Sequence, residues 1–120
     1  MENLINEDLT IEVTVIGGVF SCVWHGKSSE RDPAGTLRPW FAQLLDTVMV
    51  KTGSIEMHFE QIERFNSSTI TALIKLIQTC RKHHVQLVMV YDQTLKWQRL
   101  SFDALRVFEK ADDLFHLRQA

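Results

Sequence analysis

Between residues 55 and 91 the spacing of apolar residues changes from that of a strand to that of a helix and back again. Residues 55–59 alternate between apolar and polar, which predicts a strand with one apolar face. Over residues 70–80 the apolar positions recur at intervals of three and four, which predicts an amphipathic helix. Residues 85–91 are almost continuously apolar, as in a strand covered on both faces. This order predicts parallel strands joined by right-handed crossovers.

The preceding part of the chain predicts a hairpin and a further helix. Two runs rich in β-branched residues, 10–16 and 19–25, are separated by Gly17-Gly18, a turn signal between antiparallel strands. Apolar residues at helical spacing over 37–48 predict a first helix, which follows a turn-like Asp-Pro-Ala-Gly sequence at residues 32–35.

After the last long strand, the chain predicts a third helix with Thr94 as its amino-terminal cap, and then a short strand at 114–117. The expected fold class is therefore α/β, in the order β-β-α-β-α-β-α-(β). We expect a mixed, mostly parallel sheet of about four to five strands with an opening hairpin and three helices. Residues 1–120 are expected to form one domain, with an N-terminal tail over residues 1–9.

Charge and cysteine content exclude several classes of function. Thirteen lysines and arginines against fifteen aspartates and glutamates leave a formal charge of −2, so no broad basic surface is expected to bind nucleic acid. The acidic start of the chain does not resemble a signal peptide, and no run of about 18 apolar residues predicts a membrane span. Cys22 and Cys80 are too few for a disulfide framework. We expect a cytoplasmic protein, monomeric or weakly dimeric, that binds neither nucleic acid nor membrane.

Four consecutive residues with capping propensity, Asn66-Ser67-Ser68-Thr69, stand immediately before the apolar stripe of the second helix. A helix begins with four backbone N–H groups that lack intrahelical partners, and it carries about half a positive charge there. A phosphate on one of these hydroxyls would add about −1.5 to −2 charges and could be accommodated without unfolding the domain. The alternative is that the four residues only cap the helix.

Residues 55–117 resemble the STAS family, the anti-sigma-factor antagonist domains, in the order and spacing of strand, loop, amphipathic helix, strand and helix. The loop at 65–70 occupies the place where that family carries its regulatory phosphorylation site. Asn66 stands where many members have Asp, and Thr69 stands where they have Gly. In its Asn followed by hydroxyl residues, together with the predicted helix around Trp40 to Val48, the chain resembles the SiaC-type biofilm-regulation phosphoproteins.

The resemblance implies a non-catalytic signalling protein that switches partners when a serine is phosphorylated. The implied partners are a serine/threonine kinase or anti-sigma factor of histidine-kinase-like fold, a PPM-type phosphatase and, in the SiaC-like case, a diguanylate cyclase. Aligning the Ser-Ser pair places the phosphoacceptor at Ser68, aligning the Asn-hydroxyl pair places it at Ser67, and Thr69 is the third candidate. Whether phosphorylation promotes or blocks binding stays open. The residues expected to contact a partner are Asn66, Glu63, Arg64, Asp92 and Thr71.

Two other functions fit parts of the sequence. The same fold could act as a constitutive scaffold or as a subunit of a larger complex. Cys22-x-x-His25 and Cys80-x-x-His83 could form a metal or small-ligand site, but residues three apart on a strand point to opposite faces, which disfavours it. No nucleophile elbow, P-loop or dinucleotide fingerprint occurs, so we expect neither enzymatic activity nor a cofactor.

Overall fold

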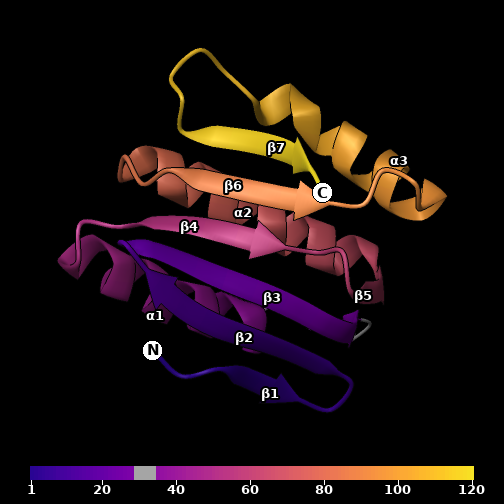
Figure 1. Ribbon diagram of the computed structural model, residues 1–120, viewed down its shortest axis with the longest axis horizontal. Coiled ribbons are helices and arrows are strands. Elements are labelled where there is room, and N and C mark those ends of the chain that lie inside the picture. Colours follow the sequence, from indigo (N-terminus) through magenta and orange to yellow (C-terminus); the bar gives the residue numbers. More distant parts are fainter. Residues whose placement is uncertain (29–34) are drawn as a thin grey trace.

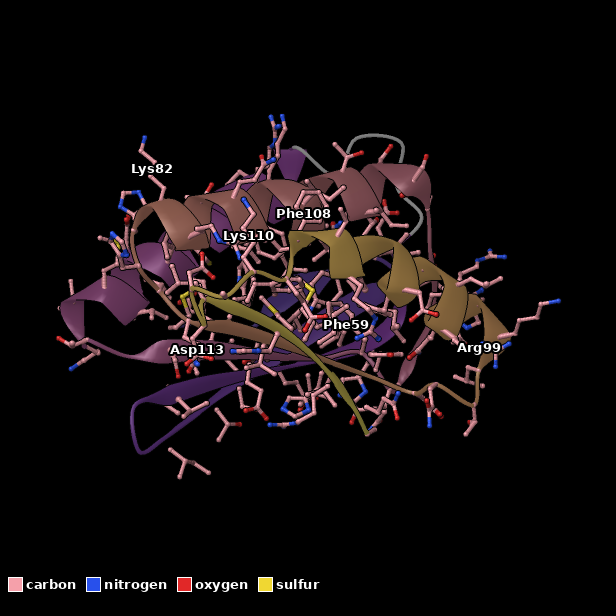
Figure 2. All side chains as sticks on the ribbon, turned by 90° about the horizontal axis from the view of Figure 1, so that it is seen from above. Phe59, Lys82, Arg99, Phe108, Lys110 and Asp113 are labelled. Carbon is pink, nitrogen blue, oxygen red and sulfur yellow. The ribbon has the colours of Figure 1, made fainter. Side chains whose placement is uncertain are left out.

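One mixed β-sheet carries three α-helices on one of its faces (Figures 1 and 2). The structure is a computed structural model and describes residues 1–28 and 35–120. Neighbouring strands follow the order β1-β2-β3-β4-β6-β7, and β5 also pairs with β3. The strands are β1 (Leu4–Asn6), β2 (Leu9–Ile16), β3 (Val19–Ser28), β4 (Ser54–His58), β5 (Ile62–Phe65), β6 (Leu87–Tyr91) and β7 (Phe115–Gln119). The helices are α1 (Leu37–Val50), α2 (Ser67–Lys82) and α3 (Lys96–Leu105), which continues into the short 3-10 helix η2 (Arg106–Phe108).

The sheet has seven strands, so the predicted number of strands and their order were wrong. Strand β1 lies in the expected N-terminal tail, pairs antiparallel with β2 and adds Leu4 to the core. Strand β5 follows β4 after residues 59–61 and pairs with the end of β3, where the register shifts between Gly26 and Lys27. The class of fold is confirmed: β3, β4, β6 and β7 are parallel neighbours, and β1, β2 and β3 are antiparallel neighbours.

The hairpin and the first two helices form as the sequence predicts. Gly17 and Gly18 close the β2–β3 hairpin with φ angles of 59° and 80°, and a two-residue turn of this hand needs positive φ at both positions. The apolar residues that predicted the first helix are all buried in α1. Helix α2 starts at Ser67 behind Asn66, as its capping residues indicate. Residues 32–34 of the predicted turn lie outside the described residues.

Two local predictions are corrected by tertiary structure. Thr94 does not cap α3, which begins behind Leu95 without a side-chain cap. The Thr94 hydroxyl instead donates to Asp92 Oδ1 at 2.6 Å, within the loop that precedes the helix. Strand β6 is covered by helices on one face only, because all three helices lie on one side of the sheet (Figure 2), whereas on its other face Val90 is buried and Val88 is half-buried.

Aromatic side chains form the centre of the core near the carboxyl ends of the parallel strands. The ring of Phe59 lies 4.9 Å from that of Trp24 and 5.0 Å from that of Phe102, measured between centroids. Tyr91 stacks on Phe102 at 5.1 Å. This packing fixes the ends of β3, β4 and β6, and so positions the loops that follow them. Among the described residues, no helix is both long and apolar enough to cross a membrane.

Candidate functional site at the start of helix α2

The candidate site lies where the chain leaves β5 and enters α2. Because β3, β4, β5 and β6 run parallel, their carboxyl ends share one edge of the sheet. The start of α2 follows β5 at this edge, and Asp92 follows β6. Phe65, the last residue of β5, packs edge-on against Trp97 and Phe102, with centroids 5.1 Å and 5.8 Å apart. These ring contacts hold Phe65 in place directly before the residues that begin α2.

Three residues, the buried Ser28 and Thr69 and the half-buried Asn66, form a set of hydrogen bonds that we call the Thr69 lock. The Thr69 side chain is fully buried, and its hydroxyl lies 2.7 Å from the Ser28 hydroxyl, 3.2 Å from the Ser28 carbonyl oxygen and 3.0 Å from Asn66 Oδ1. Asn66 Oδ1 also accepts the Thr69 N–H at 3.0 Å, which is the expected side-chain cap of α2. The lock ties the start of α2 to the end of β3.

The hydroxyls of Ser67 and Ser68 take no part in the Thr69 lock. Ser67 is exposed and Ser68 is half-buried, at the first and second helical positions. Neither hydroxyl makes a hydrogen bond to another described residue. Asn66 already supplies the cap, so capping does not account for either serine. Two hydroxyls thus stand at a helix terminus where backbone N–H groups favour a negative charge.

The other candidates come from β5, from the second turn of α2 and from the loop after β6, and all are at least partly accessible. Glu63 and Arg64 are exposed on β5, and Thr71 is exposed on α2, where its hydroxyl donates to the carbonyl four residues earlier. Asp92 accepts hydrogen bonds from the hydroxyl and the N–H of Thr94, which lower the pKa of its carboxyl below the ordinary value. Asp92 therefore presents a charge held in place by its own loop.

Gln98 is a site-positioning residue that sequence reasoning missed. Its side chain is fully buried, and its Nε2 donates to the carbonyl of Phe59 at 2.7 Å. Its Oε1 accepts the N–H of Asp92 at 2.8 Å, so one amide joins the loop after β4 to the loop after β6. The available signal was a polar residue on the buried stripe of α3, which Gln98 shares with Phe102 and Leu105.

The two Cys-x-x-His pairs are not brought together. Cys22 is fully buried on the helix-covered side of β3, whereas the His25 side chain is one-third exposed and pairs with Glu12 on the opposite side. Cys80 is fully buried in α2, and His83 is exposed just beyond it. Burial raises the pKa of both thiols to about 12, which leaves them unreactive as nucleophiles at neutral pH. Within the described residues, no group of three or more potential ligands is placed to hold a metal ion.

Comparison of the chain with models of known protein families and with curated proteins finds no match. Function is therefore inferred from the side chains themselves. The start of α2 combines a side-chain cap, a buried threonine and two serines whose hydroxyls are unused by the described residues. This arrangement can accept a covalent anionic group without breaking a hydrogen bond of the fold.

Proposed function

We propose that this chain is a non-catalytic phospho-switch protein of the STAS-like, anti-sigma-factor antagonist type. A serine/threonine kinase modifies Ser68, or Ser67 as the second choice, and the modification changes which partner the chain binds. The observation that carries the proposal is that neither serine hydroxyl bonds to another described residue, while Asn66 alone caps the helix. Thr69 is no longer a candidate acceptor, because its hydroxyl is buried in the Thr69 lock.

The electrostatics of the helix terminus support tolerance of the phosphate. A phosphate on Ser68 would carry about −1.5 to −2 charges near the positive end of the α2 dipole. The N–H groups of the first turn can donate to its oxygens, so the fold is kept while the surface changes. A partner packed on the unmodified surface would have to desolvate that charge, and a loss of about 3 kcal/mol weakens binding roughly a hundredfold.

The surroundings of the serines support a protein as the partner. Glu63, Arg64 and Thr71 are exposed beside the start of α2, and Asp92 holds an oriented carboxylate at the same edge of the sheet. The resemblance to STAS and SiaC-type proteins favours a kinase of histidine-kinase-like fold and a PPM-type phosphatase as the modifying enzymes. It favours that kinase, or a diguanylate cyclase, as the partner whose binding is switched.

The modification itself can be tested with purified components. The chain is incubated with ATP and the kinase of histidine-kinase-like fold encoded nearest to its gene, and phosphopeptides are mapped by mass spectrometry. Ser67→Ala, Ser68→Ala and the double variant serve as matched controls. We expect one phosphate that is lost in Ser68→Ala and in the double variant. A kinase that modifies another substrate but leaves residues 66–71 untouched would contradict the proposal.

A second experiment separates the switch from the constitutive scaffold. The affinity of the kinase for the unmodified chain is compared by calorimetry with its affinity for the chain carrying phosphoserine at position 68. The switch predicts a change of about a hundredfold, and Ser68→Ala should behave like the unmodified chain. Equal affinities for the parent, Ser68→Ala and Ser68→Asp would assign the scaffold role instead.

A further inference from the structure

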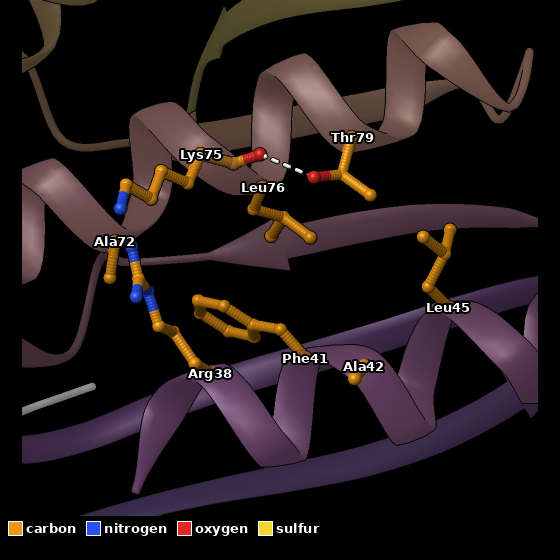
Figure 3. Close-up of a pocket in the computed structure, with 8 residues that line it drawn as sticks. All are labelled: Arg38, Phe41, Ala42, Leu45, Ala72, Lys75, Leu76 and Thr79. Atoms are coloured by element: carbon orange, nitrogen blue, oxygen red, sulfur yellow. Dashed lines mark hydrogen bonds between the residues drawn. The ribbon is translucent and has the colours of Figure 1, made fainter. Parts of the chain in front are cut away.

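A groove of about 280 Å³ lies between α1 and α2, on the outer side of the helical layer (Figure 3). Its lining is mainly apolar and comes from two turns of each helix, from Arg38 to Leu45 and from Ala72 to Thr79. Two turns of a helix rise about 10 Å, so the groove is long enough for one or two large side chains. It is slightly smaller than the range of about 300–1,000 Å³ typical of small-molecule pockets.

The groove has a positive end and an uncharged end. Arg38 in the first turn of α1 extends toward Ala72, and Lys75 lies over the same end (Figure 3). Both cationic side chains are exposed, and neither has a carboxylate within ion-pair distance among the residues that the structure describes. Leu45 and Thr79 line the other end. An occupant would therefore place an anionic group beside Arg38 and an apolar group farther along.

The positive end of the groove is also the end nearest to Ser68. Ser68 precedes Ala72 by four residues and Lys75 by seven, so all three lie on one face of α2. Helices α1 and α2 each follow a strand of the parallel part of the sheet, and in Figure 3 both begin at the Arg38 end. The positive ends of both helix dipoles add to the charges of the two cations there.

We propose that this groove anchors an apolar side chain of a protein partner, and that an adjacent carboxylate of the partner pairs with Arg38 and Lys75. The proposal rests on the partner-binding function proposed above and adds the chemistry of the partner: an acidic, amphipathic helical segment. It also gives the switch a direction. A phosphate on Ser68 enters the field of the same two cations and competes with the partner's carboxylate, so phosphorylation weakens this contact.

The test uses a defined probe and needs no identified partner. The probe is a fluorescent, helix-stapled peptide of about 12 residues with leucines at i and i+4 and a glutamate one turn before them. A matched peptide carries lysine in place of the glutamate. Binding is measured by fluorescence polarisation, and the bound surface is mapped by amide chemical shifts of the isotope-labelled chain. Decanoate, a carboxylate with a single alkyl chain, serves as a small-molecule competitor.

We expect the acidic peptide to bind, to shift amides of α1 and α2, and to lose at least about tenfold in affinity in Arg38→Glu/Lys75→Glu. The lysine peptide should bind that variant more tightly than it binds the parent chain, so that reversing the charge on both sides restores binding. The control Lys96→Glu/Lys110→Glu makes the same change of net charge at exposed positions outside the groove and should bind like the parent. Phosphoserine at position 68 should weaken binding of the acidic peptide, whereas Ser68→Ala should leave its affinity unchanged.

Three results would overturn the proposal: no binding of the acidic peptide at about 1 mM, equal binding by the charge-swapped variant, or binding of decanoate without binding of either peptide. The last result would assign the groove to a small carboxylate ligand. Peptide binding does not depend on the kinase, so the two proposals fail separately. If the charge swap rescues peptide binding but the kinase leaves Ser68 unmodified, the groove proposal stands and the phospho-switch is contradicted. If Ser68 is phosphorylated but neither peptide binds, the phospho-switch stands and the groove proposal is contradicted.

Discussion

Replacing Thr69 by valine keeps the shape of a fully buried side chain and removes the hydroxyl at the centre of the Thr69 lock. Asn66 Oδ1 would still accept the N–H of residue 69, and the Ser28 carbonyl would still accept the N–H of Asn66. Among the described residues, only the buried Ser28 hydroxyl would lose its partner. Such a loss costs about 1–3 kcal/mol. With an unfolding entropy of about 2 cal/mol/K per residue, a cost of about 2 kcal/mol lowers the Tm by about 8 °C.

The assay is thermal unfolding followed by circular dichroism, supported by urea titration. Removing both hydroxyls in Ser28→Ala/Thr69→Val should cost less than Thr69→Val alone, because no buried hydroxyl is then left unpaired. Ser68→Ala should change the free energy of unfolding by less than about 0.5 kcal/mol, since this hydroxyl bonds to no described residue. We expect the Thr69 hydroxyl to stabilise the fold and the Ser68 hydroxyl not to do so. A Thr69→Val variant as stable as the parent, or a Ser68→Ala variant as destabilised as Thr69→Val, would refute this expectation.

Three further predictions concern buried groups, Gln98 beside the site and the two cysteines. Gln98→Leu leaves the Asp92 N–H without a partner, whereas the Phe59 carbonyl still accepts the N–H of Ile62, so the free energy of unfolding should fall by about 2 kcal/mol in urea titration. A cost under about 1 kcal/mol would contradict the positioning role of Gln98. Since burial raises the pKa of Cys22 and Cys80 from 9.0 to about 12, iodoacetamide at pH 8 should spare both thiols in the native chain and modify them after unfolding; equal rates would contradict this. Between pH 9 and 12 these thiols ionise in the unfolded chain before the folded one, so the free energy of unfolding should fall as the pH rises.

Elements whose stability comes from their own amphipathic pattern were predictable, and elements that depend on a neighbour were not. The hairpin, the three helices and β4 each carry a periodic signal in the sequence, and β6 carries a continuous apolar run. Strand β1 has three residues, too few for a period to show. In β5 only Ile62 is buried, and Glu63 and Arg64 face solvent; the strand forms because β3 is long enough to pair with β4 and then with β5.

The candidate site was predictable to the level of the helix start and no further. Four residues with capping propensity located the start of α2 and its cap. Which hydroxyl is buried depends on the distance from Thr69 to Ser28, a contact across 41 residues of sequence that no local pattern encodes. The same holds for Gln98, whose partners belong to two other loops, and for the groove, whose positive end exists only because α1 and α2 pack side by side.

The central claim is that a phosphate is carried at the start of α2 in the cell. The most direct measurement is phosphopeptide mapping of this chain purified from its native cells, in growth phases with and without surface attachment, with Ser67→Ala and Ser68→Ala strains in parallel. We predict a phosphate on Ser68, or on Ser67, and an unmodified Thr69 in every sample. A chain whose residues 66–71 carry no phosphate under any of these conditions, or carry it on Thr69, would contradict the account.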